Sequence, residues 1–131
     1  MFAVEVRDHV MIAHSLPAPV FGPAQGMHGA TFVVDAAFFA AALDENGIVA
    51  DIGLATEALG AALAPLRYRN LDEAPEFAGR ITTTEVLARH VWEALAAAAR
   101  SGGLGDGGRV RRIRVTLHES HVARAWYEAD L

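Results

Sequence analysis

Residues 113–119 read Ile-Arg-Val-Thr-Leu-His-Glu, and this alternation of apolar and polar side chains is the clearest structural signal in the chain. Successive side chains of a β-strand point to opposite faces, so Ile113, Val115 and Leu117 share one face. The segment is therefore predicted to be a strand that covers a core on that face. Glu119 comes next in the same alternation, at a position where another apolar side chain is expected.

Glu119 is a candidate ligand-binding residue because the pattern places its carboxylate among core-facing side chains. A buried charge is costly unless cationic or N–H donors face it, from the protein or from a ligand. A flat heterocycle with adjacent N–H donors would satisfy the carboxylate. An ion pair with a nearby arginine, such as Arg112 or Arg124, would satisfy it as well. The alternation by itself leaves both interpretations open.

Composition restricts the class of protein. The chain has 131 residues, of which 53% are hydrophobic, as expected for a single domain over residues 1–131. Its net charge of −5 argues against nucleic acid as a partner. Without cysteine there is no disulfide and no thiolate for catalysis or metal binding. No segment resembles a signal peptide or is long and apolar enough to span a membrane, so we expect a soluble cytoplasmic protein with no membrane partner.

Periodicity and turn residues predict the order strand, strand, helix, helix, strand, strand. One face of the first strand stays mainly apolar up to Ile12 and ends with His14. Thr82 and Glu85 have the spacing of a capping box and are predicted to begin the second helix. The predicted strands are 2–14, 31–41, 109–119 and 121–128; the predicted helices are 51–66 and the segment from 82 that fades into 101–103.

This order predicts an α+β fold, in which a four-stranded antiparallel sheet has both helices on one face. The opposite face of the sheet needs other cover, because apolar residues occur on both faces of the predicted strands. We therefore expect an oligomer in which copies of the chain close the sheet edges against one another.

Six short motifs lie in order along nearly the whole chain. They are Ala13-His14-Ser15-Leu16, Gly26-Met27-His28-Gly29-Ala30-Thr31-Phe32, Gly47-Ile48-Val49-Ala50-Asp51, Pro65-Leu66-Arg67-Tyr68-Arg69-Asn70-Leu71-Asp72, Thr83-Thr84-Glu85 and Leu117-His118-Glu119-Ser120. Together they resemble the 6-pyruvoyltetrahydropterin synthase and 6-carboxytetrahydropterin synthase family. The resemblance implies the tunnelling fold, in which subunits form a trimeric barrel through their sheets. It also implies that two trimers stack into a homo-hexamer with sites between subunits.

The resemblance implies a zinc site of three histidines, of which two are present. One family histidine matches His14, and a His-x-His pair falls on His28 and Ala30, so the third ligand is missing. Catalytic zinc uses three protein ligands and one open position, so two histidines would hold zinc weakly. We expect no tightly bound metal and no other cofactor, which leaves His14 and His28 as a hydrogen-bonded pair that lines a polar pocket. Other histidines that could supply the missing ligand are His9, His118 and His121.

The family's proton relay is also altered. Its cysteine falls near Ala24 or Gln25, and its Asp-His pair falls on Arg67 and Tyr68. Arginine stays protonated, and tyrosine, with a pKa of about 10, is a poor base at neutral pH. We therefore expect the family's lyase activity to be absent. Arg67 offers a group for a phosphate or carboxylate on a new substrate, although residues 67–69 can equally form a solvated loop.

The residues that match the family's pterin-recognition positions are Glu119, Thr83 and Thr84. The family glutamate receives the ring's amino and N–H donors, and two parallel hydrogen bonds to a carboxylate discriminate strongly between ligands. A purine presents a similar amino-pyrimidine edge. A helix start explains the threonines without any ligand, so a capping role remains an alternative for them.

Three functions therefore remain open. The first is a protein that binds a pterin-like or purine-like ligand through Glu119 at a subunit interface and lacks lyase activity. The second is an enzyme with changed chemistry on such a metabolite, with Tyr68, Arg67, His14 or His28 at its site. The third is a non-catalytic assembly or regulatory protein.

Overall fold

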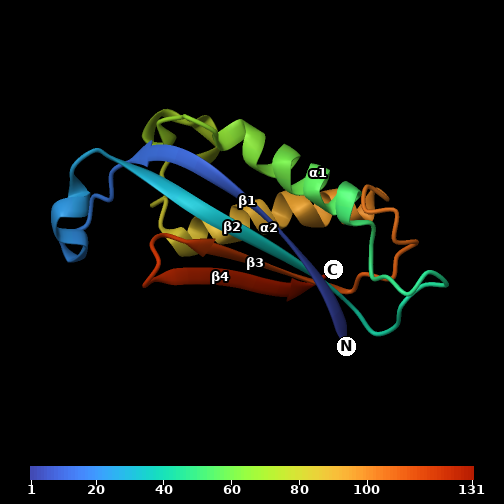
Figure 1. Ribbon diagram of the computed structural model, residues 1–131. Coiled ribbons are helices and arrows are strands. Elements are labelled where there is room, and N and C mark those ends of the chain that lie inside the picture. Colours follow the sequence, from blue (N-terminus) through green and yellow to red (C-terminus); the bar gives the residue numbers. More distant parts are fainter.

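The centre of the protein is a four-stranded antiparallel sheet (Figure 1). The computed structural model describes residues 1–131. The strands β1 (Phe2–His14), β2 (His28–Ala40), β3 (Arg112–His118) and β4 (Arg124–Asp130) lie in the sheet in that order. The helices α1 (Ile52–Leu63) and α2 (Thr84–Arg100) both lie between β2 and β3 in the sequence. The predicted order of two strands, two helices and two strands is confirmed.

Both helices lie on the same face of the sheet, as predicted (Figure 1). Helix α1 contacts β1, and α2 contacts β3 and β4. Helix α1 begins where the Asp51 side chain accepts a hydrogen bond from the Leu54 N–H at 3.0 Å, and it ends just before Pro65. No helix has the length and apolar character needed to cross a membrane. Short 3₁₀ turns occur at Pro19–Gln25, Ala64–Leu66, Leu71–Glu73 and Pro75–Phe77.

The core lies between the helices and the inner face of the sheet. Ile113, Val115 and Leu117 of β3 are buried there, as their alternation predicts. Phe38 of β2 is also fully buried, and removing one such side chain from water stabilises the fold by about 1.5–3 kcal/mol. Trp92 of α2 is tied to the sheet, because its Nε1–H donates to the carbonyl oxygen of Ile113 at 3.0 Å. The buried side chains of the strands and the Trp92 hydrogen bond therefore hold the helices against the sheet.

Helix α2 begins one residue later than the capping-box spacing predicts. Its N-cap is Thr83, whose hydroxyl accepts a hydrogen bond from the Val86 N–H at 3.3 Å. Thr82 is buried, and its hydroxyl lies 3.0 Å from Nδ1 of His14. The prediction of Thr82 as the cap was wrong, because the buried histidine ring takes Thr82 as its hydrogen-bond partner.

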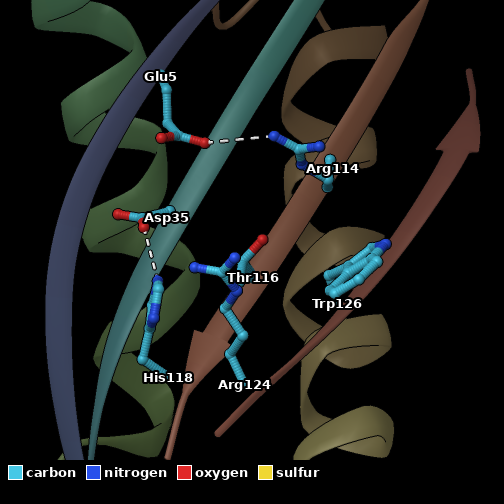
Figure 2. Close-up of a pocket in the computed structure, with 7 residues that line it drawn as sticks. All are labelled: Glu5, Asp35, Arg114, Thr116, His118, Arg124 and Trp126. Carbon is cyan, nitrogen blue, oxygen red and sulfur yellow. Dashed lines mark hydrogen bonds and ion pairs between the residues drawn. The ribbon is translucent and has the colours of Figure 1, made fainter. Parts of the chain in front are cut away.

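The outer face of the sheet, which no helix covers, is more polar than the strand sequences predict (Figure 2). On this face Arg7 forms an ion pair with Asp35, and Nε2 of His118 lies 2.8 Å from the same carboxylate. Arg114 reaches toward Glu5 on the same face.

The two edges of the sheet differ. The β1 edge is covered near its end, where the Tyr68 N–H donates to the Met11 carbonyl at 2.7 Å and the Ala13 N–H donates to the Arg69 carbonyl at 2.9 Å. The β4 edge, residues 124–130, has no such cover. Uncovered edges are able to pair with another chain. The expected oligomer stays a prediction.

Candidate functional site

His14 and His28 form the centre of the predicted pocket. They lie opposite each other in the register of β1 and β2, and their ring centroids are 4.6 Å apart in an edge-to-face arrangement. His14 is buried, with Nδ1 at 3.0 Å from the Thr82 hydroxyl. Nδ1 of His28 lies 2.8 Å from the Gly26 carbonyl oxygen, so this nitrogen is the N–H donor. Neither Nε2 atom is used in a hydrogen bond within the chain, which leaves both free for a ligand.

The surroundings of His14 favour its neutral form. Burial lowers the pKa of His14, and the neighbouring His28 lowers it further. A hydrogen bond with Thr82 and the charges of Asp72 and Glu119 act in the opposite direction. A neutral imidazole accepts hydrogen bonds and binds metal ions, so His14 is in the form that either role requires.

The structure groups no third metal-binding side chain with His14 and His28. Ala30 lies two residues after His28 on the same face of β2, where the missing ligand would be. No group of three or more His, Cys, Asp and Glu side chains is arranged to hold a metal ion. His118 is engaged elsewhere, with Nε2 at 2.8 Å from Asp35. The residues present therefore do not complete a catalytic zinc site, and the expectation of no tightly bound metal stays a prediction.

Glu119 lies just beyond β3, in the connection to β4, and is exposed. The predicted core-facing position was wrong, because the strand ends at His118 and the Glu119 N–H bonds to the Ala123 carbonyl at 3.1 Å. The alternative of an ion pair with Arg112 or Arg124 was also wrong. Arg112 pairs with acidic residues of β4, and Glu119 makes no ion pair within the chain. Glu119 is thus a free carboxylate that lines a hollow of about 270 Å³ together with Arg7 and His118.

Thr83 and Thr84 lie close to this region. They directly follow Thr82, which contacts His14, and both are half-buried at the start of α2. The capping role predicted as an alternative is confirmed for Thr83. The structure therefore brings the histidine pair and the start of α2 together.

Arg67 and Tyr68 do not join the histidine pair. Nη1 of Arg67 donates to the His9 carbonyl at 2.7 Å, and Nη2 donates to the Asp8 carboxylate at 2.8 Å. Tyr68 has a left-handed backbone (φ 56°) and is 84% exposed. Neither residue hydrogen-bonds to His14. Arg67 instead fixes the loop that follows α1 to β1, which agrees with the loop alternative.

A polar network on the outer face has no counterpart among the predicted site residues. Its centre is Asp35, a buried carboxylate in β2 that accepts two hydrogen bonds from Arg7, at 2.7 and 2.9 Å. The Arg7 hydrogen bond lowers the pKa of Asp35, burial opposes this, and the contact with His118 lowers the pKa further. The sequence feature that could have predicted this network is Asp35, the single acidic residue in the otherwise apolar segment 32–40.

Comparisons with known proteins agree on the fold and the family. The sequence profile described as 6-pyruvoyl tetrahydropterin synthase matches residues 3–130. No curated protein sequence matches the chain significantly. The structure of 6-pyruvoyl tetrahydropterin synthase from Caenorhabditis elegans is similar with a TM-score of 0.81 at 21% identity, over 98% of this chain and 95% of that chain.

Two further solved structures are similar over nearly their full lengths. The synthase of the same name from Plasmodium vivax gives a TM-score of 0.78 at 14% identity, over 100% of both chains. An uncharacterised protein from Wolinella succinogenes gives a TM-score of 0.70 at 13% identity, over 96% of this chain and 97% of that chain. The four-stranded antiparallel sheet with its helices on one face is the tunnelling fold, as predicted. With a profile match over nearly every residue, the chain belongs to the 6-pyruvoyl tetrahydropterin synthase family.

Proposed function

We propose that this protein binds a pterin-like or purine-like molecule through Glu119 at an interface between subunits, and that it lacks the lyase activity of its family. The observation that carries the proposal is the carboxylate of Glu119, which has no partner within the chain and lines a hollow of about 270 Å³. A carboxylate without a partner in its own chain can accept two parallel hydrogen bonds from the amino and N–H groups of such a ring. Pterins and purines both present that edge.

A subunit interface is part of the proposal because Glu119 is exposed in a single chain. Hydrogen bonds to a charge strengthen when water is excluded, so tight binding of a flat ring needs a cover. The uncovered edge of β4 supports assembly through the sheet. We infer a homo-hexamer of two trimers, in which a neighbouring chain covers the hollow beside Glu119.

The lack of a third zinc histidine and of a cysteine base supports binding without lyase turnover. His14 and His28 are two of the three zinc ligands, and the chain has no cysteine to act as a base. At the relay positions, Arg67 is bound to Asp8 and Tyr68 is exposed. The alternative of an enzyme with changed chemistry that uses this pair of residues gains no support from their positions.

Thermal unfolding with and without ligand tests the proposal. Pterin and guanine should each raise the melting temperature of the wild-type protein, because a ligand at a hundred times its Kd stabilises the folded state by about 2.7 kcal/mol. Glu119→Gln keeps the shape of the side chain and removes its charge, so the shift should disappear. The matched control is Glu57→Gln, since Glu57 is an exposed residue of α1 with no ion pair, and it should respond like the wild type.

Two results would contradict the proposal. One is an equal shift in the wild type and Glu119→Gln, which would place the ligand elsewhere. The other is the absence of any shift with every pterin and purine although the oligomer is intact, which would favour the assembly protein. Metal analysis of the same samples should give far less than one zinc ion per chain, and reduced pterins should be recovered unchanged.

A further inference from the structure

The outer face of the sheet holds a second hollow, which neither His14 nor Glu119 lines (Figure 2). Its volume is about 200 Å³, and its lining side chains come from all four strands. Because the helices lie on the other face, these side chains are not part of the core. Their charges and shapes therefore need an explanation other than packing.

Arg124 of β4 is a cation without a counterion in this hollow. Figure 2 shows its side chain reaching between His118 and Trp126, so that the guanidinium lies beside Thr116. It forms no hydrogen bond or ion pair with any side chain drawn there. The nearby carboxylate of Asp35 is already engaged, because Arg7 donates two hydrogen bonds to it and Nε2 of His118 lies 2.8 Å from it.

Arg114, at the other end of the hollow, is only loosely paired. Its guanidinium nitrogens are 3.9 Å from Glu5 and 3.9 Å from Glu128, beyond normal hydrogen-bond distance. Its Nε is buried without a hydrogen-bond partner. Two arginines with unused donors therefore lie at this hollow, one fully unpaired and one partly so.

Trp126 adds a flat apolar surface to the same hollow. It is 57% exposed and lies opposite Thr116 in the register of β3 and β4. Arg124 lies opposite His118 in the next pair on this face of the sheet. An exposed indole next to a free guanidinium can stack on a planar ring while the guanidinium binds an anion.

We propose that this hollow binds a small flat aromatic molecule that carries a carboxylate or a phosphate. The ring stacks on Trp126, and the anion takes charge-assisted hydrogen bonds from Arg124 and a further one from the Thr116 hydroxyl. The hollow volume of about 200 Å³ suits one or two fused rings. This site goes beyond the proposed function and does not use Glu119.

The charges of the hollow favour an anion over a cation. Asp35 is already bound by Arg7, and the guanidinium groups of Arg114 and Arg124 line the same hollow. Pairing of another chain with the β4 edge would use backbone groups and leave the side chains on this face in place. The site is therefore compatible with an oligomer that joins through its sheet edges.

The indole N–H signals in ¹H–¹⁵N NMR spectra test the proposal, because the chain has only two tryptophans. Trp126 reports on the hollow, and Trp92, whose Nε1–H is bound to the Ile113 carbonyl, is the internal control. 2-Naphthoate and guanosine monophosphate represent the carboxylate and phosphate sources of the anion. At least one of them should shift the Trp126 signal to saturation and leave the Trp92 signal in place.

Uncharged probes and variants separate the parts of the site. The uncharged counterparts 2-naphthamide and guanosine should bind at least tenfold more weakly, and so should inorganic phosphate, which has no ring. Arg124→Gln should weaken binding of the anionic probe at least tenfold, and an unchanged Trp92 signal shows that the variant is folded. Arg111→Gln removes an exposed arginine outside the hollow and should bind like the wild type.

Three outcomes would overturn the proposal: no saturable shift of Trp126 with either anion, equal binding of charged and uncharged probes, or wild-type binding by Arg124→Gln. Saturable binding of 2-naphthoate, of guanosine monophosphate or of both shows which anion the hollow accepts. Glu119→Gln should not change these titrations. A failure at Glu119 and a failure at this hollow are therefore distinguishable.

Discussion

Asp35→Asn should lower the free energy of unfolding by about 2 kcal/mol. The Asp35 side chain is 8% exposed, and its contacts with Arg7 and His118 join β1, β2 and β3. A hydrogen bond to a charged group contributes about 1.5–3 kcal/mol. The Arg7 side chain is 65% exposed, however, and an exposed ion pair contributes only about 0–1 kcal/mol. Most of the loss therefore comes from the buried amide, whose N–H groups would face the donors of Arg7.

Urea unfolding followed by circular dichroism measures this loss, and its pH dependence has a definite sign. The pKa of Asp35 is lowered in the folded protein, chiefly by the Arg7 hydrogen bond. The stabilisation is therefore fully present above the unfolded pKa of about 3.9 and is lost as the pH falls through the folded pKa. The difference between wild type and variant should be full at neutral pH and shrink in acid.

A double-mutant cycle with Arg7→Ala should give a coupling of about 1 kcal/mol between Arg7 and Asp35. Two results would refute the reasoning. One is a loss below about 0.5 kcal/mol at neutral pH, the range of ordinary surface substitutions. The other is a difference between wild type and Asp35→Asn that stays constant down to the acid transition.

Three further predictions concern the histidine pair and the start of α2. Ala30→His should complete a three-histidine site with His14 and His28. Zinc retained after dialysis should then rise to about one ion per chain. A zinc content equal to that of the wild type would contradict this geometry. The pKa of His14 is lowered in the folded protein, which favours the neutral ring. In the unfolded chain the same ring binds a proton below about pH 6.5. The free energy of unfolding should therefore fall as the pH drops below that value. His14→Gln should show a shallower slope in denaturant titrations at several pH values, and an unchanged slope would exclude His14 as the cause. Thr83→Ala should cost about 1 kcal/mol through loss of the cap, and Thr84→Ala clearly less; equal costs in urea unfolding would show that the cap is misassigned.

The elements of the fold were predictable because their signals are local. The alternation of the first strand ends at His14, where β1 ends, and the alternation up to Leu117 is buried as predicted. The N-cap of α2 was predicted one residue too early, because the Thr82 hydroxyl lies at hydrogen-bond distance from the ring of His14, 68 residues away in the sequence. Glu119 was misplaced because the strand stops where the chain turns back toward Ala123. The first error comes from a tertiary contact, and the second from a turn whose start the apolar alternation does not mark.

The candidate site was predictable in part for the same reason. The pairing of His14 with His28 was implied by the family resemblance, and the structure brings the rings together because β2 begins at His28, before the predicted start at residue 31. Arg67 was expected at the pocket, yet its partner Asp8 lies 59 positions earlier in the sequence. The network around Asp35 combines residues of three strands, so it becomes visible only when the register of the sheet is known.

The loop that lies along the last part of β1 limits how another subunit can add a strand there. Arg67 and residues 68–70 already occupy backbone groups of His9, Met11 and Ala13, so a neighbour has access only to the portion from Phe2 to Asp8. That portion is long enough for the 7 residues of β4 from a second copy. The loop thus restricts the register in which β4 of a second copy can pair with β1. A contact between these two different edges is head-to-tail, and such contacts can close into rings.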